Sequence, residues 1–161
     1  MVIQPSHANS PFAGYAPDTP GAPLFWRKRV EEMKRILDSL DAIETLVPLL
    51  AGRLDGERTT AVGHTMGAQT VGLLLGARLT DPKDDDARDV NLFDPRIKAK
   101  ILMAPPGSGG ASLSAFAAEN FSALNPDFSH MKTQALVVFA ITTSIRISPC
   151  AVPIGTRTLI T

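Results

Sequence analysis

The sequence has little cysteine, few aromatic residues and no surplus of either charge. Its 161 residues include one cysteine, one tryptophan and one tyrosine. The single thiol, Cys150, permits no intramolecular disulfide. Sixteen basic and sixteen acidic side chains cancel, so no electrostatic field favours nucleic acid or an anionic membrane as a partner.

Long apolar runs are also absent. No stretch approaches the length of a membrane span, and the opening Met-Val-Ile-Gln-Pro lacks the charged and apolar regions of a signal peptide. We therefore expect no membrane span and, by default, a cytoplasmic location. Secretion stays open as the alternative, because a shortened N-terminus would have lost its leader. The length predicts one domain, large enough to bury a core.

Apolar periodicity and turn residues predict strands and helices in alternation. Residues 2–5 read as the end of a buried strand, and residues 8–23, rich in Pro, Gly, Ala and Ser, predict a long loop. Over residues 24–46 apolar side chains recur at helical spacing among charges, which predicts an amphipathic helix. Residues 67–79 predict a second helix.

Two later apolar segments, residues 97–104 and 135–139, predict further strands. The aspartates of residues 80–95 lack the spacing of a metal-binding loop, so we expect a solvated loop there and no metal site. This order of elements predicts an α/β fold, with a mostly parallel sheet of about four strands and helices on both faces.

Functional residues of such sheets gather at the carboxyl edge. His7, Thr65 and the loop of residues 105–110 are all expected at that edge. The loop is rich in glycine, but neither Gly-Lys-[Ser/Thr] nor Gly-x-Gly-x-x-Gly accompanies it, so the sequence does not indicate a nucleotide cofactor.

The most informative segment is residues 58–67, Arg-Thr-Thr-Ala-Val-Gly-His-Thr-Met-Gly. It reads as a strand, a sharp turn and a helix, with Gly63 and Gly67 two residues before and after Thr65. Small residues at those positions let the chain reverse around a hydroxyl at the tip of the turn. The N–H of Met66 would then point to the place where an oxyanion forms. The layout is typical of a hydrolase nucleophile elbow; the alternative is a purely structural turn.

Threonine is an unusual residue for the tip of such an elbow. It keeps the hydroxyl of serine, but its methyl group stiffens χ1 and is poorly tolerated at positive φ. His64 lies inside the elbow, and we expect its side chain to pack beside the strand ends. The sequence thus predicts a recognisable elbow with an impaired nucleophile at Thr65.

Five separate motifs keep a common order and carry a family resemblance. Together they resemble the α/β-hydrolases, in the bacterial dienelactone-hydrolase-like or chlorophyllase-like esterase branch, over residues 2–139. The resemblance implies an incomplete α/β-hydrolase core, hydrolysis of carboxylic esters through a Ser-Asp-His triad, and no metal or organic cofactor. The motifs are residues 60–67, Asp94-Pro-Arg-Ile-Lys-Ala, Met103-Ala-Pro-Pro-Gly, Phe116-Ala-Ala-Glu-Asn and Asn125-Pro-Asp-Phe-Ser-His-Met.

Carried over to this chain, the resemblance puts Thr65 at the nucleophile position and Met66 at the backbone oxyanion donor. We expect His7, Pro106 and Gly107 to line the pocket. Three parts of the family's site have no counterpart in this sequence. They are the triad acid, the triad histidine and the upstream strand that brings the second oxyanion donor. Asp127 and Glu119 are expected in solvated or capping roles rather than as the missing acid.

The last segment, residues 140–161, differs from the rest of the chain. All sixteen acidic residues precede Ala140, and the segment has neither a helical nor a strand period. Its possible codons, read one base earlier, permit Gly-Asp-x-Asp where the family has its triad acid. The sequence thus predicts a partial hydrolase domain over residues 1–139 and an out-of-frame tail; the alternative is a genuine divergent tail.

These features predict an ester hydrolase by lineage that is weak or inactive. A hydroxyl without a positioned base stays protonated and is a poor nucleophile. The expected partner is a small-molecule ester, and self-association through uncovered sheet edges is expected as well. The alternatives are a non-catalytic module that binds small acyl ligands and a degenerate gene product.

Overall fold

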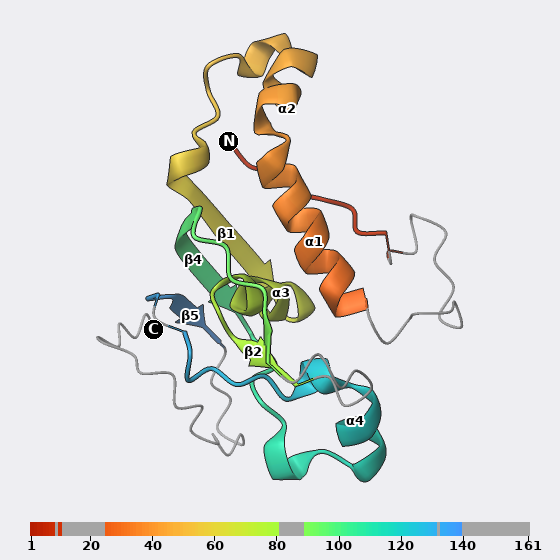
Figure 1. The fold of residues 1–161 in the computed structure, drawn as a ribbon. Helices are drawn as coiled ribbons and strands as arrows, with labels where there is room; N and C mark the ends of the chain where they lie inside the picture. The colour runs from red at the N-terminus through yellow and green to blue at the C-terminus, as the bar shows by residue number, and fades with distance from the viewer. Residues whose placement is uncertain (9, 11–24, 81–88, 132, 140–161) are drawn as a thin grey trace.

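The computed structural model describes residues 1–8, 10, 25–80, 89–131 and 133–139, shown in colour in Figure 1. Its centre is a sheet of three parallel strands in the order β1 (Thr59–His64), β4 (Ile97–Met103) and β5 (Leu136–Val138). The predicted α/β class and parallel pairing are therefore found. The described residues place three strands in this sheet, where about four were predicted from the order of elements.

The segment predicted as one long helix forms two. α1 (Phe25–Asp38) and α2 (Leu40–Leu46) meet at Ser39, whose φ of −108° and ψ of 11° depart from helical values. The Ser39 hydroxyl donates to the carbonyl oxygen of Arg35 at 2.8 Å. Such side-chain bonds to the preceding turn bend helices, and here the helix breaks. The 3₁₀ turns η3 (Pro48–Leu50) and η4 (Gly56–Arg58) lead into β1.

α3 (Met66–Leu74) is shorter than predicted. Gly76 adopts a φ of +98°, a left-handed conformation that ends helices and suits glycine. The residues that follow form a strand instead, because β2 (Arg78–Leu79) pairs antiparallel with β3 (Val90–Asn91). The prediction of one helix over residues 67–79 and one loop over 80–95 was therefore wrong at this pair; residues 81–88 lie outside the described ranges.

α3 lies between the sheet and α1 and packs against both (Figure 1). Every residue of α3 from Ala68 to Leu74 is buried, so this helix has no solvent-facing stripe of the usual amphipathic kind. Trp26 and Val30 of α1 pack into the same cluster. Burial on nearly all sides explains why an apolar, glycine-containing segment forms this helix.

The two faces of the three-stranded sheet differ in cover. Ala61 and Gly63 are buried and face α3. On the other face, Val62, Leu136 and Val138 are 52%, 42% and 47% exposed. Parallel sheets normally bury both faces. Among the described residues helices cover one face, which differs from the prediction of helices on both.

The N-terminal segment is not a buried strand. Met1 and Val2 are 68% and 89% exposed, and residues 1–8 join no described sheet. The segment is attached to α1 instead, because the N–H of Ala8 donates to Glu32 Oε1 at 3.0 Å. The apolar run of residues 2–3 therefore misled the sequence prediction.

After β4 the chain forms short helical pieces: η5 (Gly110–Ser112), α4 (Ala115–Asn120) and η6 (Ser122–Leu124). Ser114 caps α4, its hydroxyl accepting from the N–H of Ala117 at 3.1 Å. In Figure 1 this region lies beyond the carboxyl end of β4, away from α2.

A buried ion pair joins the start of β4 to the helices. Asp94 has 5% of its side chain exposed and receives two bonds from the Arg96 guanidinium, Nε to Oδ1 at 2.9 Å and Nη2 to Oδ2 at 2.7 Å. Arg96 Nη1 also donates to Asp38 Oδ1 on α1 at 2.6 Å. The N–H of Asp94 donates to the carbonyl oxygen of Leu74 on α3 at 2.9 Å. The sequence prediction of a solvated aspartate was wrong for Asp94.

We expect Asp94→Asn to lower the free energy of unfolding by about 2 kcal/mol at neutral pH, because Arg96 loses the buried one of its two carboxylate partners and keeps only the exposed Asp38. Urea unfolding measures this loss. The matched control is Asp89→Asn: Asp89 pairs with Arg78 but its side chain is 60% exposed, so its effect should stay below about 1 kcal/mol.

The Asp94 contribution also depends on pH. The hydrogen bond from Arg96 holds the pKa of Asp94 below its ordinary value. A lowered folded-state pKa gives stability that is complete above the unfolded value of about 4 and is lost as the pH falls through the folded value. The wild type should therefore lose more stability than Asp94→Asn below about pH 4. Parallel acid unfolding curves would contradict this assignment.

Candidate nucleophile elbow

Thr65 occupies the predicted turn in an unusual backbone conformation. It joins β1 to α3 with a φ of 47° and a ψ of −111°, values close to the first central position of a type II′ turn, where glycine is normal. Its N–H donates to the carbonyl oxygen of Met103 on β4 at 2.9 Å, and the residue is exposed. An exposed β-branched residue is thus held at positive φ, a sparsely populated state that costs about 1–3 kcal/mol.

The absence of a side chain at Gly63 makes this turn possible. A Cβ on Gly63 would lie 2.2 Å from the carbonyl oxygen of Gly67 and 2.5 Å from the N–H nitrogen of Ala68. No real Cβ approaches backbone atoms so closely. At Gly67, in contrast, a Cβ would meet no atom within 4 Å. The close approach of strand to helix therefore requires glycine at Gly63, and Gly67 is free of that requirement.

Met66 presents a free donor beside Thr65. As the first residue of α3 it has no acceptor within the helix, and its N–H makes no hydrogen bond to the described residues. The partial positive charge of a helix N-terminus lies at the same place. The first helical bond runs from the N–H of Gln69 to the carbonyl oxygen of Thr65 at 3.1 Å. This is the arrangement that a backbone oxyanion donor needs.

The loop after β4 begins beside the elbow, because β1 and β4 are parallel neighbours and end at the same edge. Ala104 has a φ of 44° and Gly107 a φ of 73°. Further along, Asn125 Oδ1 lies 2.6 Å from Ser108 Oγ and accepts the N–H of Gly110 at 3.1 Å. The loop thus has a defined shape at the carboxyl edge, although its positive φ at an alanine was not predicted by the sequence.

Two of the predicted pocket residues belong to this loop. Pro106 is exposed and Gly107 is half-buried. Their place just after the carboxyl end of β4 agrees with the predicted edge, and their role in lining a pocket stays a prediction. One cavity among the described residues, of about 510 Å³, is lined by Thr59 and Thr60 at the opposite end of β1.

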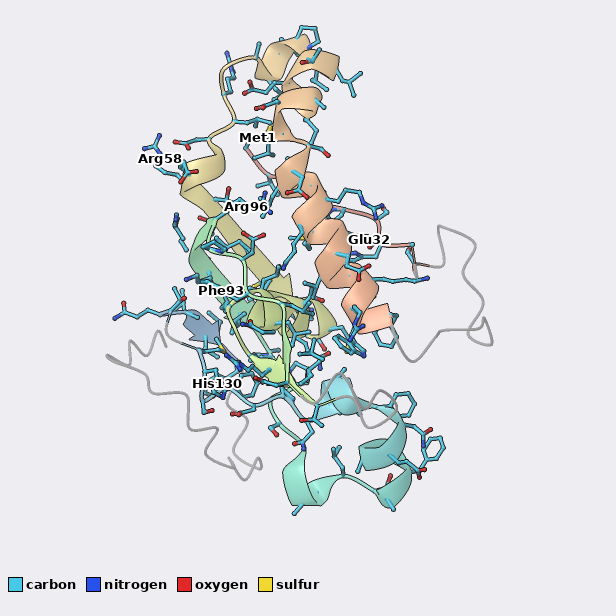
Figure 2. The ribbon with its side chains drawn as sticks, viewed as in Figure 1. Met1, Glu32, Arg58, Phe93, Arg96 and His130 are labelled. Atoms are coloured by element: carbon cyan, nitrogen blue, oxygen red, sulfur yellow. The ribbon has the colours of Figure 1, made fainter. Side chains whose placement is uncertain are left out.

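The histidines do not supply a base to Thr65 in the described part of the chain. His7 Nδ1 lies 2.6 Å from Glu32 Oε2 on α1 (Figure 2 labels Glu32), and His7 makes no contact with Thr65 there. His64 is exposed, on the uncovered face of the sheet. His130 Nε2 lies 3.7 Å from Asp127 Oδ2. His7, expected at the same edge as Thr65 and in the pocket, is bonded to α1, and its role in lining a pocket stays a prediction.

Asp127 has a structural role. Its carboxylate accepts the N–H of Ser129 at 2.8 Å and the Ser129 hydroxyl at 3.0 Å. The backbone bond from Ser129 is the main reason why the pKa of Asp127 lies below its ordinary value. Asp127 is exposed and bonds the turn that follows it, which agrees with the prediction of a solvated or capping role.

Two other kinds of site, a metal cluster and a membrane span, are not found within the described ranges. No group of three His, Cys, Asp or Glu side chains there could hold a metal ion. No described helix is long and apolar enough to cross a bilayer. The tail of residues 140–161, with its predicted change of reading frame, lies outside the described residues.

Comparisons with family models, with curated proteins and with solved structures find no match to this chain. The geometry of the turn at Thr65 therefore carries the functional argument.

The contrast between the two elbow glycines gives a matched pair of variants. Gly63→Ala should lower the free energy of unfolding by about 3 kcal/mol, because the new Cβ overlaps the backbone of α3. Gly67→Ala should leave stability unchanged or raise it by about 0.5 kcal/mol, since alanine favours a helix and the space is open. Chemical denaturation measures both; equal losses would contradict the close approach at Gly63.

Thr65 itself should be a strained position. Thr65→Gly should raise the free energy of unfolding by about 1 kcal/mol, because relief of the strained φ exceeds the entropy that glycine adds to the unfolded chain. Thermal and urea unfolding give the value. A loss of stability in Thr65→Gly would show that Thr65 is unstrained.

Proposed function

We propose that the turn at Thr65 is the acyl-transfer site of an α/β-hydrolase-type esterase, of the dienelactone-hydrolase-like or chlorophyllase-like kind, acting on small carboxylic esters. The observation that carries this proposal is the conformation of Thr65: an exposed hydroxyl residue held at a φ of 47° between a strand and a helix. A structural turn has no need of a β-branched residue at such a φ, where glycine is less strained.

The chemistry available to the turn is nucleophilic. Thr65 Oγ1 would attack the carbonyl carbon of the ester, and the carbonyl oxygen would take the electron pair, stabilised by the N–H of Met66. Collapse of this intermediate breaks the bond to the alcohol oxygen and leaves an acyl group on Thr65. Attack by water then releases the carboxylic acid and restores the hydroxyl.

The proton of the hydroxyl limits this reaction. It must pass to a base as the bond to carbon forms, and among the described residues His7 and His130 lie beside other groups, Glu32 and Asp127. Without a base and an acid the rate falls by orders of magnitude, towards what the oxyanion donor alone supplies. We therefore propose weak turnover for this chain.

The lack of a base also favours a second candidate. A turn that keeps a hydroxyl and an oxyanion donor but has no partner for the proton can bind a small acyl compound without hydrolysing it. Such a non-catalytic module would use the same Met66 N–H to hold the carbonyl oxygen of its ligand.

Turnover of p-nitrophenyl acetate by the purified chain tests the proposal. Thr65→Ala should reduce the rate to that of the buffer, whereas Thr65→Ser should raise kcat several-fold, because serine lacks the methyl group that stiffens χ1. Thr45→Ala is the control, since Thr45 lies on α2 and its hydroxyl donates to the carbonyl oxygen of Asp41. Its rate should equal that of the wild type.

The possible results separate the candidates. A rate that Thr65→Ala leaves unchanged would contradict acyl transfer at the elbow. Saturable binding of a non-hydrolysable ester analogue without turnover would favour the binding module. If the protein shows no turnover and no binding, the degenerate gene product remains as the explanation.

A further inference from the structure

The outer edge of β1 has no partner among the described residues. The sheet order places β1 at one end, with β4 on its inner side, as Figure 1 shows. No backbone hydrogen bond joins its outer side to another described segment. The cavity of about 510 Å³ opens beside Thr59 and Thr60, between β1, α1 and residues 1–3. The start of β1 therefore borders a cavity rather than another strand of the described chain.

The pattern of hydrogen bonds shows which groups face outward. Along a strand, successive residues direct their N–H and C=O groups to opposite neighbours. Since the N–H of Thr65 donates to Met103 on β4, the alternate residues Ala61 and Gly63 also face β4. The N–H and C=O groups of Thr60, Val62 and His64 therefore point away from the sheet, and no other described segment pairs with them.

The edge has few of the features that protect natural edge strands: the register of β1 against β4 shifts between Thr59 and Thr60, at the start of the strand, and the rest of β1 is regular. Proteins block such edges with charged side chains, proline, bulges or short strands. The six residues of β1, Thr59–His64, include no lysine, acidic residue or proline. The other end of the sheet is better protected, because β5 has only three residues.

We propose that β1 pairs with β1 of a second copy of this chain, antiparallel, across a two-fold axis. In an isologous contact the same groups of each copy donate hydrogen bonds to, and accept them from, the other copy. The outer edge of β1 offers N–H donors and C=O acceptors in equal number. Two three-stranded sheets would then become one continuous sheet of six strands. Backbone pairing at Thr60, Val62 and His64 would satisfy the groups that are free in one copy.

The charges at the two ends of β1 suit this direction of pairing. Arg58, just before the strand, is exposed and bonded to Asp55, and His64 ends the strand. Antiparallel pairing places the Arg58 side chains of the two copies at opposite ends of the β1–β1 interface, so these like charges do not meet. Parallel pairing would place them side by side.

The open apolar face of the sheet would continue across the β1–β1 interface into the second copy. Residues of neighbouring strands lie in rows across this face, with Val62, Ile101 and Leu136 in one and His64, Met103 and Val138 in the next. In the pair these rows meet those of the second copy near Val62, which is 52% exposed. Contact between the two Val62 side chains adds apolar burial to the backbone hydrogen bonds.

Analytical ultracentrifugation of the full chain over a range of concentrations tests the pairing. We expect a reversible dimer, and Val62→Pro should weaken its association at least tenfold. Proline is tolerated here because the N–H of Val62 faces outward and carries no bond to β4. The matched control is Leu136→Lys, which puts a charge on the open face away from the edge; it should change the association less than twofold.

A synthetic peptide of residues 58–65, Arg-Thr-Thr-Ala-Val-Gly-His-Thr, gives a second measurement that does not depend on the variant folding. It should bind the edge and shift the dimer towards monomer, whereas a scrambled peptide should not. A monomer at every concentration would overturn the proposal. So would a dimer that Leu136→Lys abolishes and that Val62→Pro and the peptide leave intact, since that result would indicate packing of the open faces instead.

Discussion

The close approach of β1 to α3 at Gly63 is the constraint on which the rest of the structure depends. With no side chain at Gly63, the backbone of the first turn of α3 packs directly against the strand. The chain must then reverse within one residue, and Thr65 takes the positive φ that this reversal demands. The same reversal places α3 across β1 and β4, where its buried residues form the core with α1. Fold and candidate site therefore share one steric origin.

The elbow holds two of the groups that the proposed acyl transfer needs, and the described residues place no base beside them. The exposed residue Thr65 and the free N–H of Met66 lie together at the carboxyl edge of a parallel sheet, where binding sites of such folds gather. Two of the described histidines lie beside other carboxylates, His7 at Glu32 and His130 near Asp127, and His64 is exposed on the uncovered face of the sheet. Strain at a turn is retained where the surroundings over-determine it. Here the packing of α3 against β1 is enough to hold Thr65 in its strained conformation, whether or not the turn catalyses a reaction.

Much of the fold could be predicted from the sequence, because it follows from local patterns. Glycine spacing around Thr65 predicted the elbow, and apolar segments predicted β4 and β5 and their parallel order. The predictions failed where tertiary contacts decide. The apolar periodicity continues past Ser39, but its hydroxyl bonds to the preceding turn and the helix breaks there. Gly76 ends α3 earlier than predicted. Asp94 is buried and bonded to Arg96, two residues away.

The backbone of the candidate site could be predicted from the sequence, but the contacts of the side chains around it could not. The Gly63-to-Gly67 spacing specifies a turn, since sterics act over a few residues. The place of His7 could not be read from spacing, because it depends on Glu32, which lies 25 positions away on α1. Ala104 at positive φ has no sequence signal, as alanine does not favour that conformation.

Acylation of the purified protein with p-nitrophenyl acetate, followed by location of the acetyl group by peptide mass spectrometry, tests the role of Thr65 most directly. We predict that Thr65 carries the acetyl group at higher occupancy than any other exposed serine or threonine, and that Gly63→Ala, which disrupts the turn, abolishes it. Acetyl groups found on surface lysines alone, with Thr65 unmodified, would contradict the assignment of this turn as an acyl-transfer elbow.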